Sequence, residues 1–152
     1  MVIDAQAAAD SLLLASQSLP AAHVLVVGGV ANLVLSFLLG WLLSARRMRE
    51  PIDSYRWLLT AHEISLQEGV MLLGLAVALP WAHLPGWCAE LAAWLLVVGS
   101  LFQDFSSIVN WLRGTRDQFA ERSAGWVLAS VNAVINTAGL GIVAVGVARG
   151  ML

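Results

Sequence analysis

A histidine and two carboxylates lie close together in a segment that is otherwise apolar enough to cross a bilayer. His62, Glu63 and Glu68 occur near the start of the stretch that ends at Pro80. A charged side chain in hydrocarbon costs roughly 2.5 to 3.5 kcal/mol even on lenient insertion scales. Such groups persist where they face a bundle interior, a ligand or a water-filled cavity. Residues 62–69 are therefore the first candidate for a functional site.

A second set of polar side chains follows in the next apolar stretch. On a helix they fall within about a third of the circumference; they are Ser100, Gln103, Asp104, Ser107, Asn110 and Trp111. Asp104 lies about two turns before Arg113, on the same half of the membrane as His62. Polar groups at matched depth on two helices predict a buried site, with Glu68, Asp104 and Asn110 as candidate catalytic residues.

His62 admits two interpretations. A lone intramembrane histidine can be a hydrogen-bonded packing residue. It can also be the single axial ligand of a haem iron whose opposite position stays open for substrate. His23 and His83 are expected at the other side of the membrane. Neither can then pair with His62 in one subunit, so an electron-carrying haem held by two histidines is disfavoured.

The composition predicts an integral membrane protein. The 152 residues are 59% hydrophobic and 12% charged, and that charged fraction is about half the average for soluble domains. Four stretches reach the ~20 residues that a membrane helix requires. We expect an all-α four-helix bundle that forms a single membrane domain over 1–152, with helices at about 21–45, 58–80, 86–112 and 124–148.

The positions of the basic residues predict how the bundle crosses the membrane. All eight cations are arginine, and seven lie in or beside two short loops, one at 46–56 and one at 113–122. Positive charge accumulates in cytoplasmic loops, so we expect both termini on the outer side. Residues 1–19 have no basic region and carry two aspartates. They are expected to form a tail or an interfacial helix rather than a signal peptide.

Other patterns exclude functions or predict packing. The single cysteine excludes an internal disulfide and a cysteine zinc site. Phosphate loops, nucleophile elbows and basic nucleic-acid patches are missing from the sequence, so no nucleic-acid partner is expected. Asn132 and Asn136 are expected to hydrogen-bond across helices. Residues at every fourth position form a stripe for close helix contact: Gly28, Asn32, Ser36 and Gly40.

Several residues of the second and third predicted helices match a known pattern: Ala61-His62, Gly69, Met71, Leu79-Pro80, then Gly99-Ser100 and Asp104. This pattern resembles the styrene oxide isomerase family, whose members are four-helix membrane chains of similar length. The resemblance implies a homotrimer in the bacterial cytoplasmic membrane that binds ferric haem b between subunits. It also implies that the iron acts as a Lewis acid and converts a small apolar epoxide from the bilayer into an aldehyde.

The resemblance carries over to individual residues. His62 matches the axial haem ligand of the family and is the expected metal ligand, and Ser65 and Gly69 share its side of the helix and are placed in the cofactor site. Glu68 takes the place of a pocket asparagine, and Asp104 matches an acidic residue of the third helix.

One residue of the family pattern is missing. The family has a tyrosine that contacts substrate, and this position falls near Trp111 or Leu112 here. The only tyrosine of the chain is Tyr55. Asn110 or Trp111 are the available replacements, and haem binding survives this departure better than the specific reaction does.

Two functions of other classes stay open. One is a small oligomeric transporter coupled to protons through Glu68 or Asp104, which predicts pH-dependent substrate binding that is lost in Glu68→Gln, and no visible absorbance. The other is a non-enzymatic protein, either a membrane haem-binding protein or an accessory subunit whose polar residues bind a partner helix. An accessory subunit predicts co-purification with another chain and tolerance of His62→Ala.

Overall fold

Four long helices make up nearly all of the chain in the structure, a computed structural model that describes the backbone of residues 5–151 and the side chains of residues 19–151. In chain order they are α1 (Ala5–Arg47), α2 (Ile52–Ala78), α3 (Gly86–Leu112) and α4 (Ala124–Met151). The short 3-10 helix η1 (Leu79–Trp81) follows α2. Within the described residues there is no strand, so the predicted all-α class is confirmed.

Each of the four helices is long and apolar enough to cross a membrane. The spans are Leu19–Arg47, Ile52–Trp81, Gly86–Leu112 and Ala124–Met151. The prediction of an integral membrane four-helix bundle is therefore confirmed. The second helix begins earlier than the expected residue 58, because Pro51 has the extended backbone of an N-cap (φ −68°, ψ 156°) and the helix starts directly after it.

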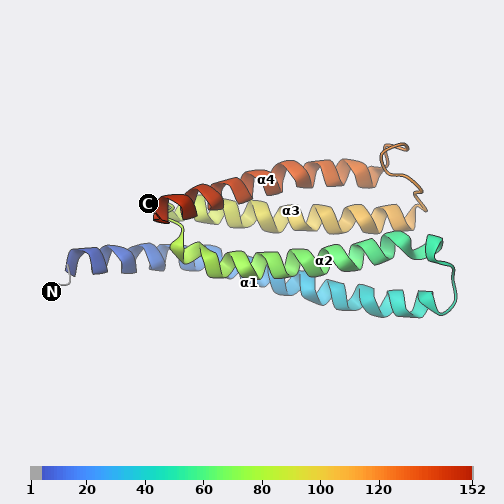
Figure 1. Ribbon diagram of the computed structural model, residues 1–152, viewed down its shortest axis with the longest axis horizontal. Coiled ribbons are helices and arrows are strands. Elements are labelled where there is room, and N and C mark those ends of the chain that lie inside the picture. The colour runs from blue at the N-terminus through green and yellow to red at the C-terminus, as the bar shows by residue number, and fades with distance from the viewer. Residues whose placement is uncertain (1–4, 152) are drawn as a thin grey trace.

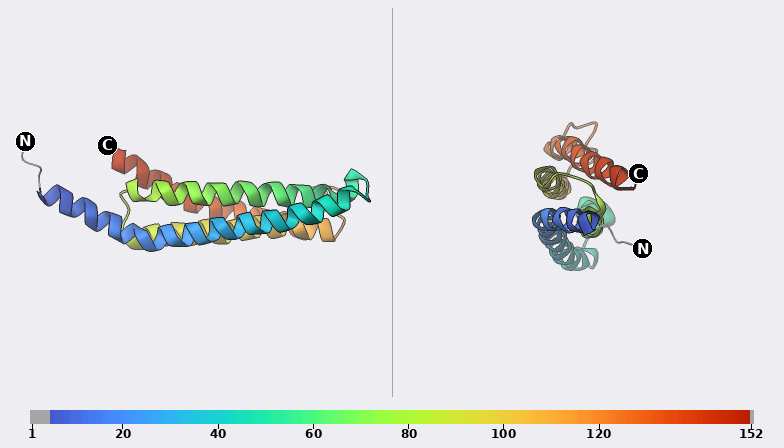
Figure 2. Two further views of the ribbon diagram at one scale, coloured as in Figure 1. Left: turned by 90° about the horizontal axis from the view of Figure 1, so that it is seen from below. Right: turned by 90° about the vertical axis from the view of Figure 1, so that its left-hand side faces the viewer.

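The first helix is also longer than expected. It begins at Ala5 and continues through Pro20, so the stretch predicted as a tail or interfacial helix is continuous with the first span from Ala5 onward. Proline removes one backbone hydrogen bond and bends helices, and α1 changes direction near this region (Figure 2). Residues 1–4 of that prediction lie outside the described residues.

The helices form two antiparallel pairs, α1 with α2 and α3 with α4 (Figure 1). α3 also packs against α1 and α2, whereas α4 makes at most marginal contact with either of them. α3 is therefore the central helix of the bundle, and the sides of α2 and α4 that face each other are left without helix-to-helix packing.

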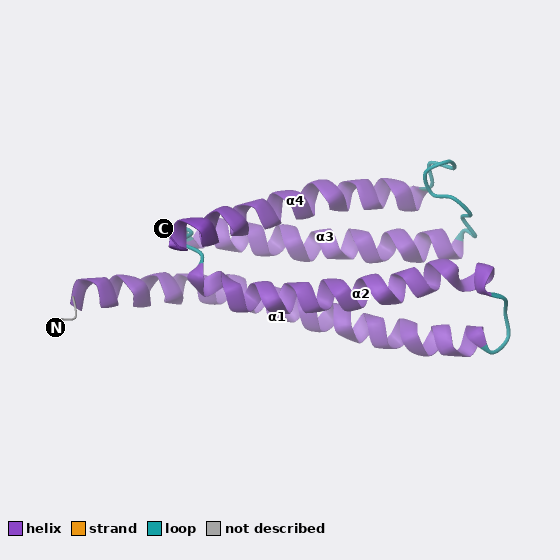
Figure 3. Ribbon diagram, in the orientation of Figure 1, coloured by secondary structure: helices purple, strands orange, loops and turns teal. Residues whose placement is uncertain are grey.

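The two ends of the bundle differ in what they carry. The 48–51 and 113–123 loops lie together at one end, which we call the arginine-rich end (Figure 3). Ala5, Met151 and the turn after α2 lie toward the other, which we call the terminal end. The predicted grouping of the arginine loops on one side is confirmed, and the assignment of that side to the cytoplasm stays a prediction.

Two apolar clusters hold the bundle together. The larger one lies in the half next to the terminal end, where Leu25, Leu72, Leu96 and Val143 pack among alanines. The smaller one lies next to the arginine-rich end and consists of Leu39, Leu43, Tyr55, Leu58 and Ala61. Ser65 of α2 and Ser100 and Asp104 of α3 are buried between these two clusters.

Candidate functional site

Polar side chains of α2 and α3 meet where the sequence predicts matched depth. Ser65 Oγ donates a hydrogen bond of 2.6 Å to Asp104 Oδ1. Asp104 is 1% exposed, and its other carboxylate oxygen has no hydrogen-bond partner among the described residues. The expected convergence of the two polar helices is confirmed for this pair.

His62 faces α1 and is held there by Ser36. Its Nδ1 lies 2.9 Å from the backbone oxygen of Ser36 and 3.0 Å from the hydroxyl, while that hydroxyl donates to the backbone oxygen of His62. A carbonyl oxygen can only accept a hydrogen bond, so Nδ1 carries the hydrogen. In the neutral ring the lone pair is then on Nε2, which makes no hydrogen bond to residues 19–151.

The small-residue stripe of α1 makes this arrangement possible. A Cβ atom at Gly40 would lie 3.2 Å from Cε1 of the His62 ring, so the glycine leaves room for the imidazole. Farther along α1, Asn32 Nδ2 donates to Ser100 Oγ at 3.1 Å. The predicted role of the stripe in close helix contact is confirmed, and Ser36, predicted only for packing, is also the partner that orients His62.

Gly69 contributes to packing between α1 and α2. A Cβ atom there would lie 2.9 Å from the side chain of Leu33 and 3.0 Å from the backbone oxygen of Gly29. Only glycine permits this approach without displacing α1. The placement of Gly69 and Ser65 in a cofactor site stays a prediction, since Gly69 lies against α1 and Ser65 is bonded to Asp104.

Glu68 lines a groove of about 390 Å³ that runs between α2 and α4 over α3. Gln67, Gln103 and Asn132 also line it. One carboxylate oxygen of Glu68, Oε2, is buried and has no partner among the described residues. The groove therefore presents a carboxylate among amides on a side of the bundle that none of the four described helices covers.

Both asparagines of α4 contact α3 beside Gly99, and Asn132 also lines the groove. Asn132 Nδ2 donates to Gln103 Oε1 of α3 at 2.7 Å, which confirms the predicted bond across helices. Asn136 Nδ2 donates instead to Asn132 Oδ1 at 2.6 Å within α4. The carboxamide oxygen of Asn136 has no hydrogen-bond partner among residues 19–151 and lies against Gly99 of α3, where an added Cβ atom would collide with it.

Asn110 is engaged at the arginine-rich end. It is fully buried, its Nδ2 donates to Gln118 Oε1 at 3.0 Å, and its Oδ1 accepts a 2.7 Å bond from Ser123 Oγ. Both of its polar atoms therefore hold the 113–123 loop against α3. Its predicted role near substrate stays a prediction, and its observed contacts are structural.

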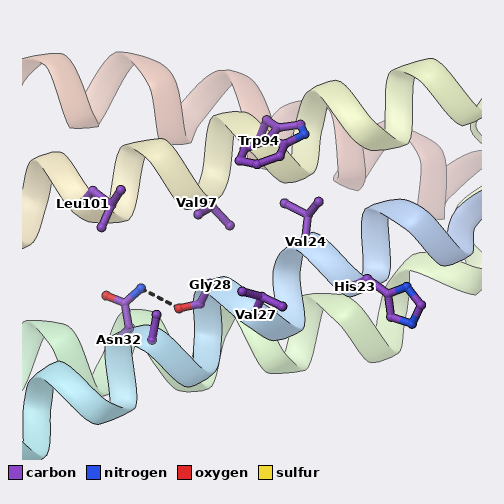
Figure 4. A pocket seen from close by; sticks show the side chains of 9 residues that line it. His23, Val24, Val27, Gly28, Asn32, Trp94, Val97 and Leu101 are labelled. Atoms are coloured by element: carbon purple, nitrogen blue, oxygen red, sulfur yellow. Dashed lines mark hydrogen bonds between the residues drawn. The ribbon is translucent and has the colours of Figure 1, made fainter.

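An apolar cavity of about 410 Å³ lies between α1 and α3, nearer the terminal end. Figure 4 shows His23 and Asn32 at its two ends and Trp94 and Val97 on the α3 side. The predicted site residues of α2 do not line it. His23 lies in the same half as His83, as expected, and far along the bundle from His62.

The predicted site residues therefore lie in separate places within one chain, with Asn110 at the arginine-rich end. Ser65 and Asp104 meet in the core, His62 lies on the side of α2 that packs against α1, and Glu68 lies in the groove toward α4. Residues six apart on a helix are about 120° apart around its axis, which explains why His62 and Glu68 separate.

The chain matches no protein-family model, no curated protein and no solved structure. The fold defines an integral membrane protein with four helices.

Proposed function

We propose that the protein is a membrane haem b protein with His62 as its only axial ligand, and that it isomerises small apolar epoxides. The observation that supports this best is the hydrogen bond from His62 Nδ1 to the backbone oxygen of Ser36. Histidines that bind metals characteristically donate their second ring N–H to a carbonyl or carboxylate, which fixes the tautomer and the ring orientation. His62 has this arrangement, and its Nε2 is free to bind iron.

The side chains around the proposed ligand have distinct tasks. Ser36 holds the imidazole, and Gly40 leaves space beside the ring. When bound, a ferric haem with one histidine ligand supplies a Lewis acid that polarises an epoxide oxygen. Glu68 and Asp104 each have a carboxylate oxygen without a hydrogen-bond partner among residues 19–151. They would orient the substrate or stabilise the positive charge that develops as the C–O bond breaks.

The proposal includes self-association. His62 and Glu68 lie on different sides of α2, so a site that uses both takes them from two copies of the chain. A single chain would also leave the polar groove beside Glu68 facing hydrocarbon, which is unfavourable. A homotrimer in the bacterial cytoplasmic membrane, as the resemblance to styrene oxide isomerases implies, would cover the groove. Native mass spectrometry of the solubilised protein tests this, and a monomer alone would contradict it.

Epoxide turnover tests the enzymatic part of the proposal. The protein loaded with haem should convert a lipophilic aryl epoxide into the carbonyl isomer. Glu68→Gln and Asp104→Asn should keep the haem spectrum and lower kcat, whereas His83→Ala, at the terminal end, should leave both unchanged. Haem-loaded wild type that converts no epoxide would contradict the isomerase assignment and leave haem binding intact.

The groove favours a second candidate function, a proton-coupled transporter. Glu68 has an unpartnered carboxylate oxygen in a groove lined by amides, and Asp104 is the neighbouring carboxyl group. A carboxyl group in this setting can bind and release a proton as a substrate moves past. The transporter predicts pH-dependent substrate binding that is lost in Glu68→Gln, from a protein without visible absorbance.

A further inference from the structure

A third recess opens at the arginine-rich end, between the start of α2 and the 113–123 loop. This polar cleft has a volume of about 600 Å³, and its lining includes Arg56, Arg116, Asp53, Trp57 and Trp111. None of these residues lines the groove beside Glu68. The cleft is therefore separate from the site of the proposed reaction.

Hydrogen bonds between α2 and the loop keep the cleft in shape. Trp57 Nε1 donates to the backbone oxygen of Thr115 at 2.5 Å, and the Arg56 guanidinium donates to the backbone oxygen of Arg116. The Thr115 N–H in turn donates to the backbone oxygen of Asn110 at 3.0 Å. Both sides of the cleft are thus tied together before any ligand arrives, which lowers the entropic cost of binding.

The carboxylates of the loop are occupied by backbone N–H groups. Asp117 Oδ1 accepts bonds from the N–H groups of Ala120 and Phe119, which hold the pKa of Asp117 below its usual value. Glu121 Oε1 accepts bonds from the N–H groups of Arg116 and Asp117. These acidic side chains stabilise the loop and do not form ion pairs with its arginines.

The residues that line the cleft carry more positive than negative charge. In the described part of the chain the one ion pair joins Arg46 to Glu50, so the Arg56 and Arg116 guanidinium groups have no carboxylate within ion-pair distance. Asp53 is the only acidic residue of the lining, and Asp117 faces Arg56 from farther away. Two cations against one lining carboxylate favour an anionic ligand.

We propose that this cleft binds the phosphate of an anionic phospholipid. Guanidinium groups match phosphate oxygens in geometry and remain charged at any physiological pH. Trp57 and Trp111 in the lining are residues that membrane proteins place at the level of lipid headgroups. The cleft also lies where the α2 and α3 spans end, so the acyl chains of a bound lipid can follow the helices into the bilayer. A free phosphate ion shares the headgroup chemistry but lacks those chains.

Lipid retention by the full-length protein in detergent tests the proposal, with native mass spectrometry as the readout. Phosphatidylglycerol, phosphatidylcholine and inorganic phosphate are each added to wild type, Arg116→Gln and Arg47→Gln. The Arg116 side chain makes no hydrogen bond within residues 19–151, so its substitution removes charge and leaves the loop contacts in place. Arg47 lies at the same end but outside the cleft lining, which makes it the matched control.

Wild type should retain phosphatidylglycerol and release phosphatidylcholine. Arg116→Gln should weaken phosphatidylglycerol binding about fivefold, the effect expected for one arginine at a membrane surface, and Arg47→Gln should bind as wild type does. Equal retention of both lipids, or equal losses in the two variants, would overturn the proposal. Displacement of the lipid by inorganic phosphate would overturn it in favour of a soluble phosphate ligand.

Discussion

The half of the bundle next to the terminal end is held by the larger apolar cluster, whereas the half next to the arginine-rich end combines a smaller apolar cluster with buried polar side chains. Leu25, Leu72 and Leu96 are completely buried in the first half. Asp104 and Asn110 are buried to a similar degree in the second. A buried polar group destabilises a protein unless it is hydrogen-bonded. The first half therefore acts as the scaffold, and the second half contains the groups that a function would require.

Some of the buried polar side chains lack a hydrogen-bond partner. Four buried side-chain atoms of the described residues have no hydrogen-bond partner: Asn32 Oδ1, Glu68 Oε2, Asp104 Oδ2 and Asn136 Oδ1. All four are oxygens that accept hydrogen bonds. Their missing partners are therefore donors, supplied by water, a ligand, a neighbouring chain or a proton on one of the carboxyl groups.

The largest change in stability should come from the scaffold. Leu96→Ala removes a buried side chain that lies beneath Gly139, where a Cβ atom would be only 2.9 Å from Leu96 Cγ. We expect a loss of about 3 kcal/mol in the free energy of unfolding, measured in detergent. Leu101→Ala on the same helix is the control, because Leu101 is 43% exposed. Equal losses in the two variants would contradict the assignment of Leu96 to the scaffold.

A smaller loss is expected where the loop joins α4. A Cβ atom at Gly125 would collide with the side chain of Asn110. Gly125→Ala should therefore cost about 2 kcal/mol through overpacking. Gly141→Ala, where a Cβ atom would meet nothing within 4 Å, should leave stability unchanged or slightly raised. Thermal unfolding of the two variants side by side measures the difference, and a destabilised Gly141→Ala would count against it.

The polar contact between α2 and α3 should contribute less again. Ser65→Ala removes the hydroxyl that donates to Asp104, and we expect a loss of about 1 kcal/mol, in the range measured for hydrogen bonds between membrane helices. Ser130→Ala is the matched control, because Ser130 is exposed and bonds only to the backbone oxygen of Trp126 in its own helix. No difference between the two unfolding free energies would show that the Ser65 contact is dispensable.

The smallest effect concerns the pH response of the 113–123 loop. The N–H groups of Ala120 and Phe119 lower the pKa of Asp117 from its ordinary value of 3.8. A lowered pKa in the folded state means that the stabilisation is complete above 3.8 and is lost as the pH falls through the folded value. The amide NMR shift of Ala120 should titrate with a midpoint below 3.8, and the titration should vanish in Asp117→Asn. A midpoint above 3.8 would contradict this account.

Much of the fold could be predicted from the sequence, because hydrocarbon allows few alternatives. The length of each apolar stretch predicts a membrane-spanning helix, and the structure has four such spans. Short loops then force neighbouring helices to run antiparallel, so the distance from each loop was enough to place the polar segments of α2 and α3 at matched depth. The structure shows Ser65 and Asp104 meeting there. The early start of α2 could also have been found, since proline is common at the beginning of helices and Pro51 directly precedes the first helical residue, Ile52.

The grouping of the site residues could not be predicted in the same way. Helical spacing predicts that His62 and Glu68 lie on different sides of α2. It does not predict which neighbouring helix each side contacts. That depends on how α2 is rotated, and the close approach of Gly69 to α1 sets the rotation. The contacts of Asn110 with Gln118 and Ser123 follow from the loop conformation, which periodicity does not encode.

The absorbance spectrum of the detergent-purified protein after haem-replete expression tests the central claim most directly. Wild type is compared with His62→Ala and with His83→Ala, a histidine at the opposite end whose backbone N–H bonds to Gly146. We predict a strong Soret band in wild type and His83→Ala that is lost or shifted in His62→Ala. Wild type without a Soret band, or a His62→Ala spectrum identical to that of wild type, would contradict ligation of haem by His62.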